Sequence, residues 1–387
     1  MNLDVFLTKK CNMKCVFCGA WVEENCPVLL PEDLKIIFKE GKAFGFRYTT
    51  LSGGEPLIYP YFKEAVEIAV MNGFWVNVTT NGLLIDQGII DFLKSKNVNL
   101  RISLHTLKKE KHQAITGNDT WDIIVNNIKL LQKNKMYFSQ GCTIYADNVS
   151  EIESMAEFAF ESGAAYIRYT PVVGVNKGSG YETDREFYRD SLKRIVNVVL
   201  KYRSYISYEK SELSYSGQFK KDFISLMTTR RCPAGSNLFM IIDSDYNLLP
   251  CQFIPMEDGW YQHCDKISSI SEEFLSLRNN MMNHFRESRH KEHNGICKEC
   301  EYVGTCLGGC LANRLPKSRK MEDEQDICIL SLVNEVLEAL KQEDQDFLID
   351  YWMYYFNQRI TKKDRNLSCM RKLPIWEINF RMDVPRM

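Results

Sequence analysis

Short apolar segments alternate with longer amphipathic segments over residues 1–203. The short segments have the length and composition of strands, expected at Leu3–Leu7, Tyr48–Leu51, Phe74–Thr79, Asn99–Leu104, Tyr137–Tyr145 and Tyr166–Thr170. The longer ones repeat apolar residues at helical spacing, which predicts helices at Pro31–Phe44, Tyr61–Met71, Asp86–Lys94, Trp121–Gln132 and Ser150–Glu161. This alternation indicates an α/β fold with a parallel sheet, and six units fit a partial (β/α)6 barrel.

The pattern changes after residue 203. A Gly-rich loop at 172–181 and a helix at Asp184–Tyr202 end the first region, and residues 204–231 are rich in Tyr, Ser and Lys. Strands at Leu238–Ile242 and Leu248–Cys251 predict a hairpin, and a later helix contains Leu330, Val333 and Leu337. We expect four parts: a barrel domain at 1–203, a bridge at 204–231, a cysteine-rich domain at 232–330, and a C-terminal helix with an aromatic and basic tail at 331–387.

Composition narrows the class of protein. The chain has 387 residues, 45% of them hydrophobic, and a net charge of −1, so no general attraction to nucleic acid or to a membrane surface is expected. We find no signal peptide and no apolar run of membrane-spanning length. Fourteen cysteines without an export signal favour metal binding in a reducing cytoplasm over disulfides.

Three cysteines follow the first predicted strand. Cys11, Cys15 and Cys18 have C-x3-C-x2-C spacing on one loop, and soft thiolates suit an iron–sulfur cluster. Three ligands on a four-iron cube leave one iron open, and an open metal position is a reaction site. A zinc knuckle or ordinary buried thiols are the alternatives, although no fourth local ligand follows.

With the aromatic Phe17 before the last cysteine, this stretch resembles the signature of the radical SAM superfamily. The resemblance implies that the open iron chelates S-adenosylmethionine (SAM). An electron from the cluster then cleaves SAM, and the 5′-deoxyadenosyl radical abstracts hydrogen from a substrate. That chemistry belongs to the cofactors, and the protein positions and shields them. The resemblance therefore implies that Cys11, Cys15 and Cys18 are the catalytic cysteines.

Further candidate residues lie at the predicted strand ends. Gly53-Gly54-Glu55-Pro56 resembles the GGEP motif, which in relatives contacts the SAM amino group, and a carboxylate suits an ammonium. The resemblance also implies a set of polar or aromatic residues that line SAM: Thr79, Thr80, Asn81, Ser103, His105 and Tyr145. His105 could instead cap its loop. Arg168 could pair with a carboxylate or remain solvated.

A second cysteine array follows the hairpin region, with the order Cys232, Cys251, Cys297, Cys300, Cys306, Cys310 and Cys328. It resembles the SPASM extension of radical SAM enzymes, which implies two auxiliary 4Fe-4S clusters besides the one that binds SAM. By position, the outer cluster would take Cys297, Cys300, Cys306 and Cys328, and the inner one Cys232, Cys251 and Cys310. A pair of zinc sites is the alternative reading of the array alone.

Two departures from SPASM relatives affect the inner cluster. Tyr246 stands where relatives often have Gly, so we expect a different turn, supported by Asp245 or Asn247. Some relatives supply a fourth inner ligand from a cysteine shortly before the first, which is missing here, so the inner cluster is expected to have an open position. The distant candidates for a fourth ligand are Cys264 first, then Cys26 and Cys369; Cys142 is expected to be a buried thiol.

The resemblance implies maturation of a ribosomally made peptide by crosslinking, thioether formation, epimerisation or oxidation. It also implies an electron donor such as flavodoxin or ferredoxin. Because the chain begins at the first barrel strand, we expect recognition through the tail, the bridge or a separate leader-binding protein. The alternatives are a small-molecule enzyme, acting on a tetrapyrrole side chain or dehydrogenating a sugar or cyclitol, and a non-catalytic zinc scaffold.

Overall fold

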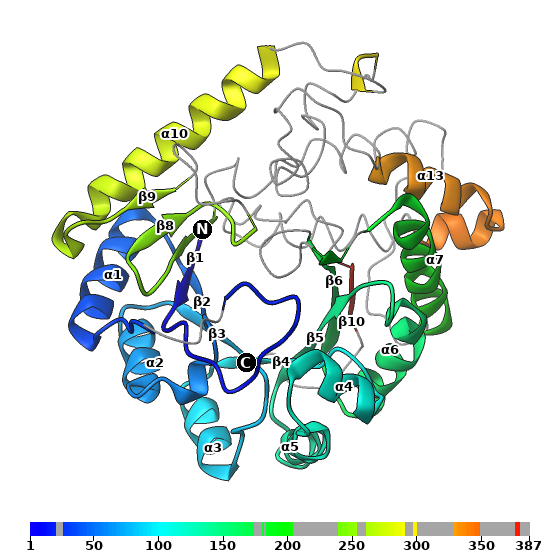
Figure 1. The fold of residues 1–387 in the computed structure, drawn as a ribbon, viewed down its shortest axis with the longest axis horizontal. Helices are drawn as coiled ribbons and strands as arrows, with labels where there is room; N and C mark the ends of the chain where they lie inside the picture. The colour runs from blue at the N-terminus through cyan, green and yellow to red at the C-terminus, as the bar shows by residue number, and fades with distance from the viewer. Residues whose placement is uncertain are drawn as a thin grey trace.

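The computed structural model describes residues 1–20, 26–173, 180–181, 183–203, 239–253, 261–290, 297–299, 328–348 and 376–379. Ten strands in these ranges form one sheet, in the order β10-β6-β5-β4-β3-β2-β1-β7-β8-β9. Strands β1 to β6 are parallel to one another, and the helices between them lie outside the curved sheet (Figure 1). The mixed α/β fold and the parallel sheet are therefore confirmed, and the curvature is consistent with a partial barrel.

The barrel region contains each predicted strand and helix, with ends that differ by a few residues. Its strands are β1 Asn2–Phe6, β2 Tyr48–Ser52, β3 Trp75–Thr80, β4 Asn99–Ser103, β5 Phe138–Ile144 and β6 Tyr166–Pro171. Its helices are α1 Pro31–Phe44, α2 Phe62–Met71, α3 Gln87–Ser95, α4 Lys109–Thr116, α5 Trp121–Lys133, α6 Ile152–Glu161 and α7 Arg185–Lys201, with the 3-10 turns η1 Pro56–Ile58 and η2 Val149–Glu151. Helix α4 was not predicted, because its sequence is mostly polar.

Local sequence explains where these helices begin and what they bury. Helix α1 starts with Pro31, a residue that suits the first turn because it needs no amide donor, and Asp33 accepts a hydrogen bond from the amide of Leu30 at 3.1 Å. Its predicted apolar face, which includes Leu34 and Phe38, is buried against the sheet region. The helix ends at Gly45, whose φ of 110° is a left-handed cap that favours glycine.

Apolar and polar residues alternate along the strands, so one face of the sheet is apolar and the other is polar. In β4, Leu100 and Ile102 are buried, whereas Arg101 and Ser103 between them are partly exposed. Successive side chains of a strand point to opposite faces, so the buried residues face the surrounding helices. The other face, on the concave side of the sheet, therefore carries polar residues.

The predicted hairpin extends the barrel sheet. Strand β7 (Phe239–Ile242) pairs in parallel with β1, and β8 (Asn247–Leu249) and β9 (Gln262–His263) follow it antiparallel. Sequence analysis placed the hairpin in a separate region, because pairing between distant strands leaves no local pattern. The short strand β10 (Trp376–Asn379) pairs antiparallel with β6 at the other edge.

Two further helices cover the sides of the barrel. Helix α10 (Ile270–His290) packs on α1, where the rings of Phe274 and Phe44 are 5.5 Å apart, and Ser271 donates a 2.7 Å hydrogen bond to Glu40. Helix α13 (Ile329–Glu338), the helix expected through Val333, lies along α7 and is linked to it by ion pairs of Glu335. No helix in the described ranges combines the length and apolarity needed to cross a bilayer.

Candidate active site

Cys11, Cys15 and Cys18 lie on the loop that follows β1, as predicted. The loop is held by α4, because the amides of Lys14 and Val16 donate to the carbonyls of Thr116 (2.8 Å) and Ile115 (2.9 Å). The amide of Cys18 donates to the carbonyl of Cys15 at 3.1 Å. Helix α4, which the sequence did not predict, therefore fixes one side of the cysteine loop.

The three thiols are close enough to influence one another. Burial raises the pKa of Cys11 to about 11, and the charges of Glu55 and Cys18 add to the effect. Burial also raises the pKa of Cys15, with further contributions from Cys18 and Cys11. A bound metal cluster would reverse this, since its positive charge favours thiolates.

Three thiols on one loop suit an iron–sulfur cluster, because thiolates are soft ligands. In a four-iron cube each thiolate binds a different iron, so the ligands need not converge on one point. The cysteine loop therefore fits the cluster implied by the resemblance.

Gly53 and Gly54 pack against the start of the cysteine loop. The amide of Gly54 donates to the carbonyl of Thr8 at 2.7 Å, and the amide of Glu55 donates to that of Lys10 at 2.9 Å. A Cβ on Gly54 would lie 2.0 Å from the Lys10 oxygen, and one on Gly53, where φ is 123°, would lie 2.4 Å from the Thr8 oxygen. The glycines thus let two backbone segments approach each other; their contact with SAM stays a prediction.

Glu55 is the buried centre of this arrangement, with 1% of its surface exposed. Its carboxylate accepts hydrogen bonds from the Thr80 hydroxyl (2.6 Å), the Asn81 amide (2.8 Å) and the Leu57 amide (3.0 Å). Burial raises its pKa to about 7, and these hydrogen bonds oppose the rise. Glu55 therefore joins the ends of β2 and β3, while its contact with a SAM ammonium remains a prediction.

Asn12 extends the connection to the cysteine loop. Its side-chain oxygen accepts a 2.6 Å hydrogen bond from Asn81, and its carbonyl accepts one of 2.8 Å from Asn118. The sequence analysis did not propose Asn12 as a site residue, although its place inside the cysteine motif could have indicated one. Together with Glu55 it fixes the predicted site residues Thr80 and Asn81 beside Cys11.

Phe17, His105 and Tyr145 form an aromatic cluster beside Cys18. The ring of Phe17 is 5.0 Å from that of His105 and 5.8 Å from that of Tyr145, and Tyr181 completes the group at 6.4 Å. The structure thus brings together three residues that the sequence proposed separately and adds Tyr181, which lies at the end of the Gly-rich loop.

His105 also organises the loop after β4. Its Nδ1 lies 3.0 Å from the amide of Thr143 and accepts its hydrogen bond, and its carbonyl accepts one of 2.8 Å from Asn148. Burial lowers the pKa of His105 to about 4, and the charge of His112 adds to this, so the ring is neutral near pH 7. The loop-capping alternative is therefore observed, and a ribose contact stays untested.

The remaining predicted residues of the barrel lie around this group. Pro56 is buried at the start of η1. Thr79, Ser103 and Arg168 are partly exposed on the concave side of the sheet, with Arg168 opposite Gly141 of β5 and Glu377 of β10. They could line a substrate there, but no hydrogen bond joins them to the cysteine loop among the described contacts.

Part of the second cysteine array falls within the described ranges. Cys251 follows β8, Cys297 begins a short described segment, and Cys328 precedes α13. The predicted ligands Cys232, Cys300, Cys306 and Cys310 lie outside the described residues, as do Cys369, the bridge and most of the tail. Both auxiliary clusters therefore remain predictions.

Two of the remaining cysteines are buried. Cys142 is 3% exposed within β5, as predicted. Cys264 is also buried, and its thiol donates to the carbonyl of Lys266 at 3.1 Å while packing in the main apolar core. This contact gives no support to Cys264 as a hidden ligand.

The turn of the β7–β8 hairpin differs from the expectation. Asp243 supports it, because its Oδ1 accepts hydrogen bonds of 2.9 Å from the amides of Asp245 and Asn247. Tyr246 has a φ of 61°, the left-handed conformation that glycine adopts easily. The turn thus keeps a glycine-like backbone at a tyrosine instead of a different turn type, whereas the side chain of Asn247 supports it as expected by donating a 3.1 Å hydrogen bond to Oδ2 of Asp243.

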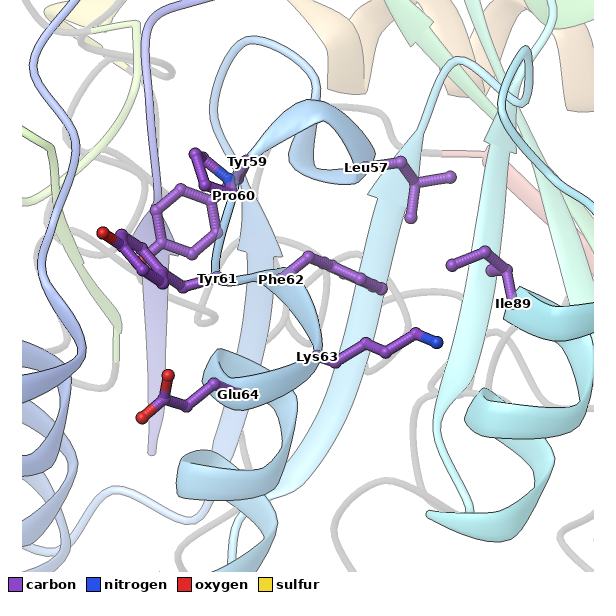
Figure 2. A pocket seen from close by; sticks show the side chains of 8 residues that line it. All are labelled: Leu57, Tyr59, Pro60, Tyr61, Phe62, Lys63, Glu64 and Ile89. Atoms are coloured by element: carbon purple, nitrogen blue, oxygen red, sulfur yellow. The ribbon is translucent and has the colours of Figure 1, made fainter.

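A surface pocket lies apart from these groups. It has a volume of about 400 Å³ and is lined by Leu57, Ile89 and residues 59–64. Figure 2 shows these side chains at the beginnings of α2 and α3, on the helix side of the sheet. None of the three cysteines lines it, so the pocket and the cysteine loop are separate features.

Comparison with known proteins agrees with the site. The sequence model of the radical SAM superfamily matches residues 5–159. A probable GTP 3′,8-cyclase of Sulfurisphaera tokodaii is 31% identical over 171 residues, which are 42% of this chain and 53% of that protein. The match to this relative thus covers only about half of its length.

Two other relatives match over more of their length. An AdoMet-dependent heme synthase of Methanosarcina barkeri is 27% identical over 84% of this chain and 94% of that protein. The mycofactocin maturase MftC of Mycobacterium tuberculosis is 24% identical over 84% of this chain and 81% of the maturase.

Solved structures show the same fold at low sequence identity. Streptococcus suis SuiB bound to its precursor peptide SuiA has a TM-score of 0.64 and 19% identity, over 84% of this chain and 74% of SuiB. The structure of anSMEcpe with bound AdoMet and the Cp18Cys peptide has a TM-score of 0.65 and 20% identity, over 88% and 99%. The chain therefore contains, at residues 5–159, a radical SAM domain that carries the cysteine loop after β1.

Proposed function

We propose that this protein is a radical SAM enzyme that matures a ribosomally made peptide by abstracting hydrogen from one of its residues. The similarity to the maturase MftC over most of both chains carries this proposal. SuiB and anSMEcpe, which share the fold, are also described with peptides. The product could be a crosslink, a thioether, an epimer or an oxidised residue.

The residues around the cysteine loop have distinct tasks in this proposal. Cys11, Cys15 and Cys18 would hold the cluster, which when bound would supply the electron for the reductive cleavage of SAM. Glu55 holds the ends of β2 and β3 in place through Thr80 and Asn81. The aromatic cluster of Phe17, His105, Tyr145 and Tyr181 forms an apolar wall beside Cys18, which would help exclude water from a reactive intermediate.

Two auxiliary 4Fe-4S clusters are part of the proposal. They would take up the electron left on the substrate, with the outer ligands Cys297, Cys300, Cys306 and Cys328 and the inner ligands Cys232, Cys251 and Cys310. Anaerobically reconstituted protein should then contain about 12 iron atoms per chain. An iron content near four would contradict the auxiliary clusters but leave the SAM-binding cluster unaffected.

The decisive experiment is anaerobic incubation with SAM, a reductant and candidate precursor peptides, followed by mass spectrometry. A mass change in one peptide, together with 5′-deoxyadenosine, is the expected result. The matched control replaces Cys11, Cys15 and Cys18 with Ala, which should abolish both products while leaving the auxiliary iron. Flavodoxin or ferredoxin as donor, and a separate leader-binding protein, can be added to the same assay.

A tetrapyrrole is the second candidate substrate. The relative that favours it is the AdoMet-dependent heme synthase, which matches this chain over 94% of its own length. The same assay with modified porphyrins in place of peptides separates the two functions. Turnover of a porphyrin, with every peptide unchanged, would contradict peptide maturation.

A further inference from the structure

The cysteine loop and the hairpin turn leave the sheet side by side. Strands β1 and β7 are parallel neighbours, with Val5 opposite Ile242. Since β1 and β7 run in the same direction, the loop after β1 and the turn after β7 both begin at the carboxyl ends of these strands. The first carries Cys11, and the second is the hairpin turn (Asp243–Asn247), after which β8 runs back in the opposite direction.

A partly buried charge contact joins these two segments. Lys9, two residues before Cys11, pairs through its ammonium group with Asp245, and it lies 3.8 Å from Oδ2 of Asp243. The side chains of Lys9 and Asp245 are 27% and 38% exposed, whereas that of Asp243 is 6% exposed, so solvent screens the Asp243 side of the contact less than the Asp245 side.

The acidic side of the contact is rigid. Asp243 accepts hydrogen bonds at Oδ1 from two amides of its own turn and at Oδ2 from the Asn247 side chain at 3.1 Å. The turn is fixed on its other side by Tyr246, whose hydroxyl donates a 2.8 Å hydrogen bond to Asp33 in the first turn of α1. Lys9 therefore meets a turn whose own shape is already determined.

We propose that Lys9 is a positioning residue that fastens the hairpin turn to the cysteine loop and so fixes the backbone next to Cys11. The role of Cys11 as a ligand of the SAM-binding cluster rests on the proposed function. Lys9 itself is not a cluster ligand in this proposal. It acts by making one rigid unit of two segments that lie far apart in the sequence.

Hydrogen–deuterium exchange on the anaerobically reconstituted full-length protein tests the fastening. Lys9→Met should speed exchange of the amides at residues 243–247 by several-fold, and Asp245→Asn should do the same. Lys10→Met is the matched control, because it removes the same charge from the neighbouring exposed residue. Unchanged exchange of the turn in both Lys9→Met and Asp245→Asn would overturn the proposal.

Swapping the two charges is the control for a variant that merely folds poorly. The double variant Lys9→Asp, Asp245→Lys restores an ion pair of opposite direction, so its exchange should return toward that of the unmodified protein. Loss of protection in the double variant equal to the sum of the single losses would mean that the two residues act independently, against the proposal.

The effect on Cys11 needs a readout other than turnover. The EPR spectrum of the reduced SAM-binding cluster depends on how its ligands are held, and we expect shifted g values in Lys9→Met, but not in Lys10→Met, at unchanged iron content. An unchanged spectrum would overturn this part of the proposal. If the unmodified protein binds no cluster, the proposed function fails instead, and exchange alone decides whether Lys9 fastens the turn.

Discussion

The Thr80 hydroxyl donates a 2.6 Å hydrogen bond to Oε1 of Glu55, and the Asn81 amide donates one of 2.8 Å to Oε2 of the same carboxylate. Two strand ends therefore share one buried acceptor. A carboxylate can satisfy donors on both oxygens, whereas a carboxamide can satisfy them on only one.

Glu55→Gln should therefore weaken the fold as well as any contact with SAM. The NH2 group of Gln would face either the Asn81 amide or the Thr80 hydroxyl, so one of these donors would lose its acceptor. A buried donor without an acceptor costs about 1–3 kcal/mol of unfolding free energy. Denaturant unfolding and SAM binding should be measured together. Glu64→Gln, at an exposed position of α2, is the control and should change neither quantity. Unaltered unfolding of Glu55→Gln would show that these hydrogen bonds contribute little.

Gly54→Ala should disrupt the start of the cysteine loop. Its Cβ would lie 2.0 Å from the Lys10 oxygen, which belongs to the backbone and cannot rotate away. We expect a loss of about 3 kcal/mol in stability, and lower iron content in the SAM-binding cluster. Gly88→Ala in α3 is the matched control, since its Cβ meets its nearest neighbour, Asp86, at 3.4 Å. An equal effect of the two substitutions on unfolding would contradict this account.

The neutral state of His105 predicts a pH dependence of stability. Burial lowers the folded-state pKa to about 4, while an unfolded histidine titrates near 6.5. Between these values the unfolded chain binds a proton that the folded chain does not. The stabilisation is complete above pH 6.5 and falls as pH drops toward 4, by up to about 3 kcal/mol.

His105→Asn removes this titration and keeps an acceptor for the Thr143 amide. Its unfolding free energy should therefore fall less between pH 6.5 and pH 4.5 than that of the unmodified protein. Urea unfolding at several pH values measures the difference. Parallel pH profiles of the two proteins would exclude His105 as the titrating group.

Cys264→Ala should leave the auxiliary iron unchanged. Its thiol is buried and donates to the carbonyl of Lys266, so the substitution removes core packing at a cost of about 1–2 kcal/mol. Cys251→Ala, by contrast, should lower the iron content and alter the EPR signal of the reduced auxiliary clusters. Loss of the same signal in Cys264→Ala would identify it as the missing inner ligand and close the position proposed to be open.

The barrel elements could be predicted because each leaves a local pattern. Helix α1 has Pro31 at its start and a periodic apolar face, and β4 alternates buried and partly exposed residues. Helix α4 left no such pattern, since its sequence is mostly polar and only a few of its residues, such as Ile115, are buried. Its importance to the cysteine loop arises from backbone hydrogen bonds, which sequence does not reveal.

Many residues of the candidate site could be predicted from the sequence, but their arrangement could be predicted only in part. The cysteine motif was found from spacing and residue type, and Glu55 from the resemblance of its surroundings to the GGEP motif. That Gly54 accommodates the backbone of Lys10, and that Tyr246 adopts a left-handed conformation anchored on Asp33, depend on contacts between segments distant in the chain. Such contacts become visible only when the strands are placed beside one another.

The pairing of β1 with β7 has a consequence for folding during synthesis. Strand β1 leaves the ribosome first, and β2 can pair with it soon afterwards, but Phe239 must be synthesised before it can pair with Asn2. Until then one edge of β1 has unsatisfied backbone groups, and the Lys9 contact cannot form. The segment that binds the first cluster therefore reaches its final shape only after most of the chain has been made.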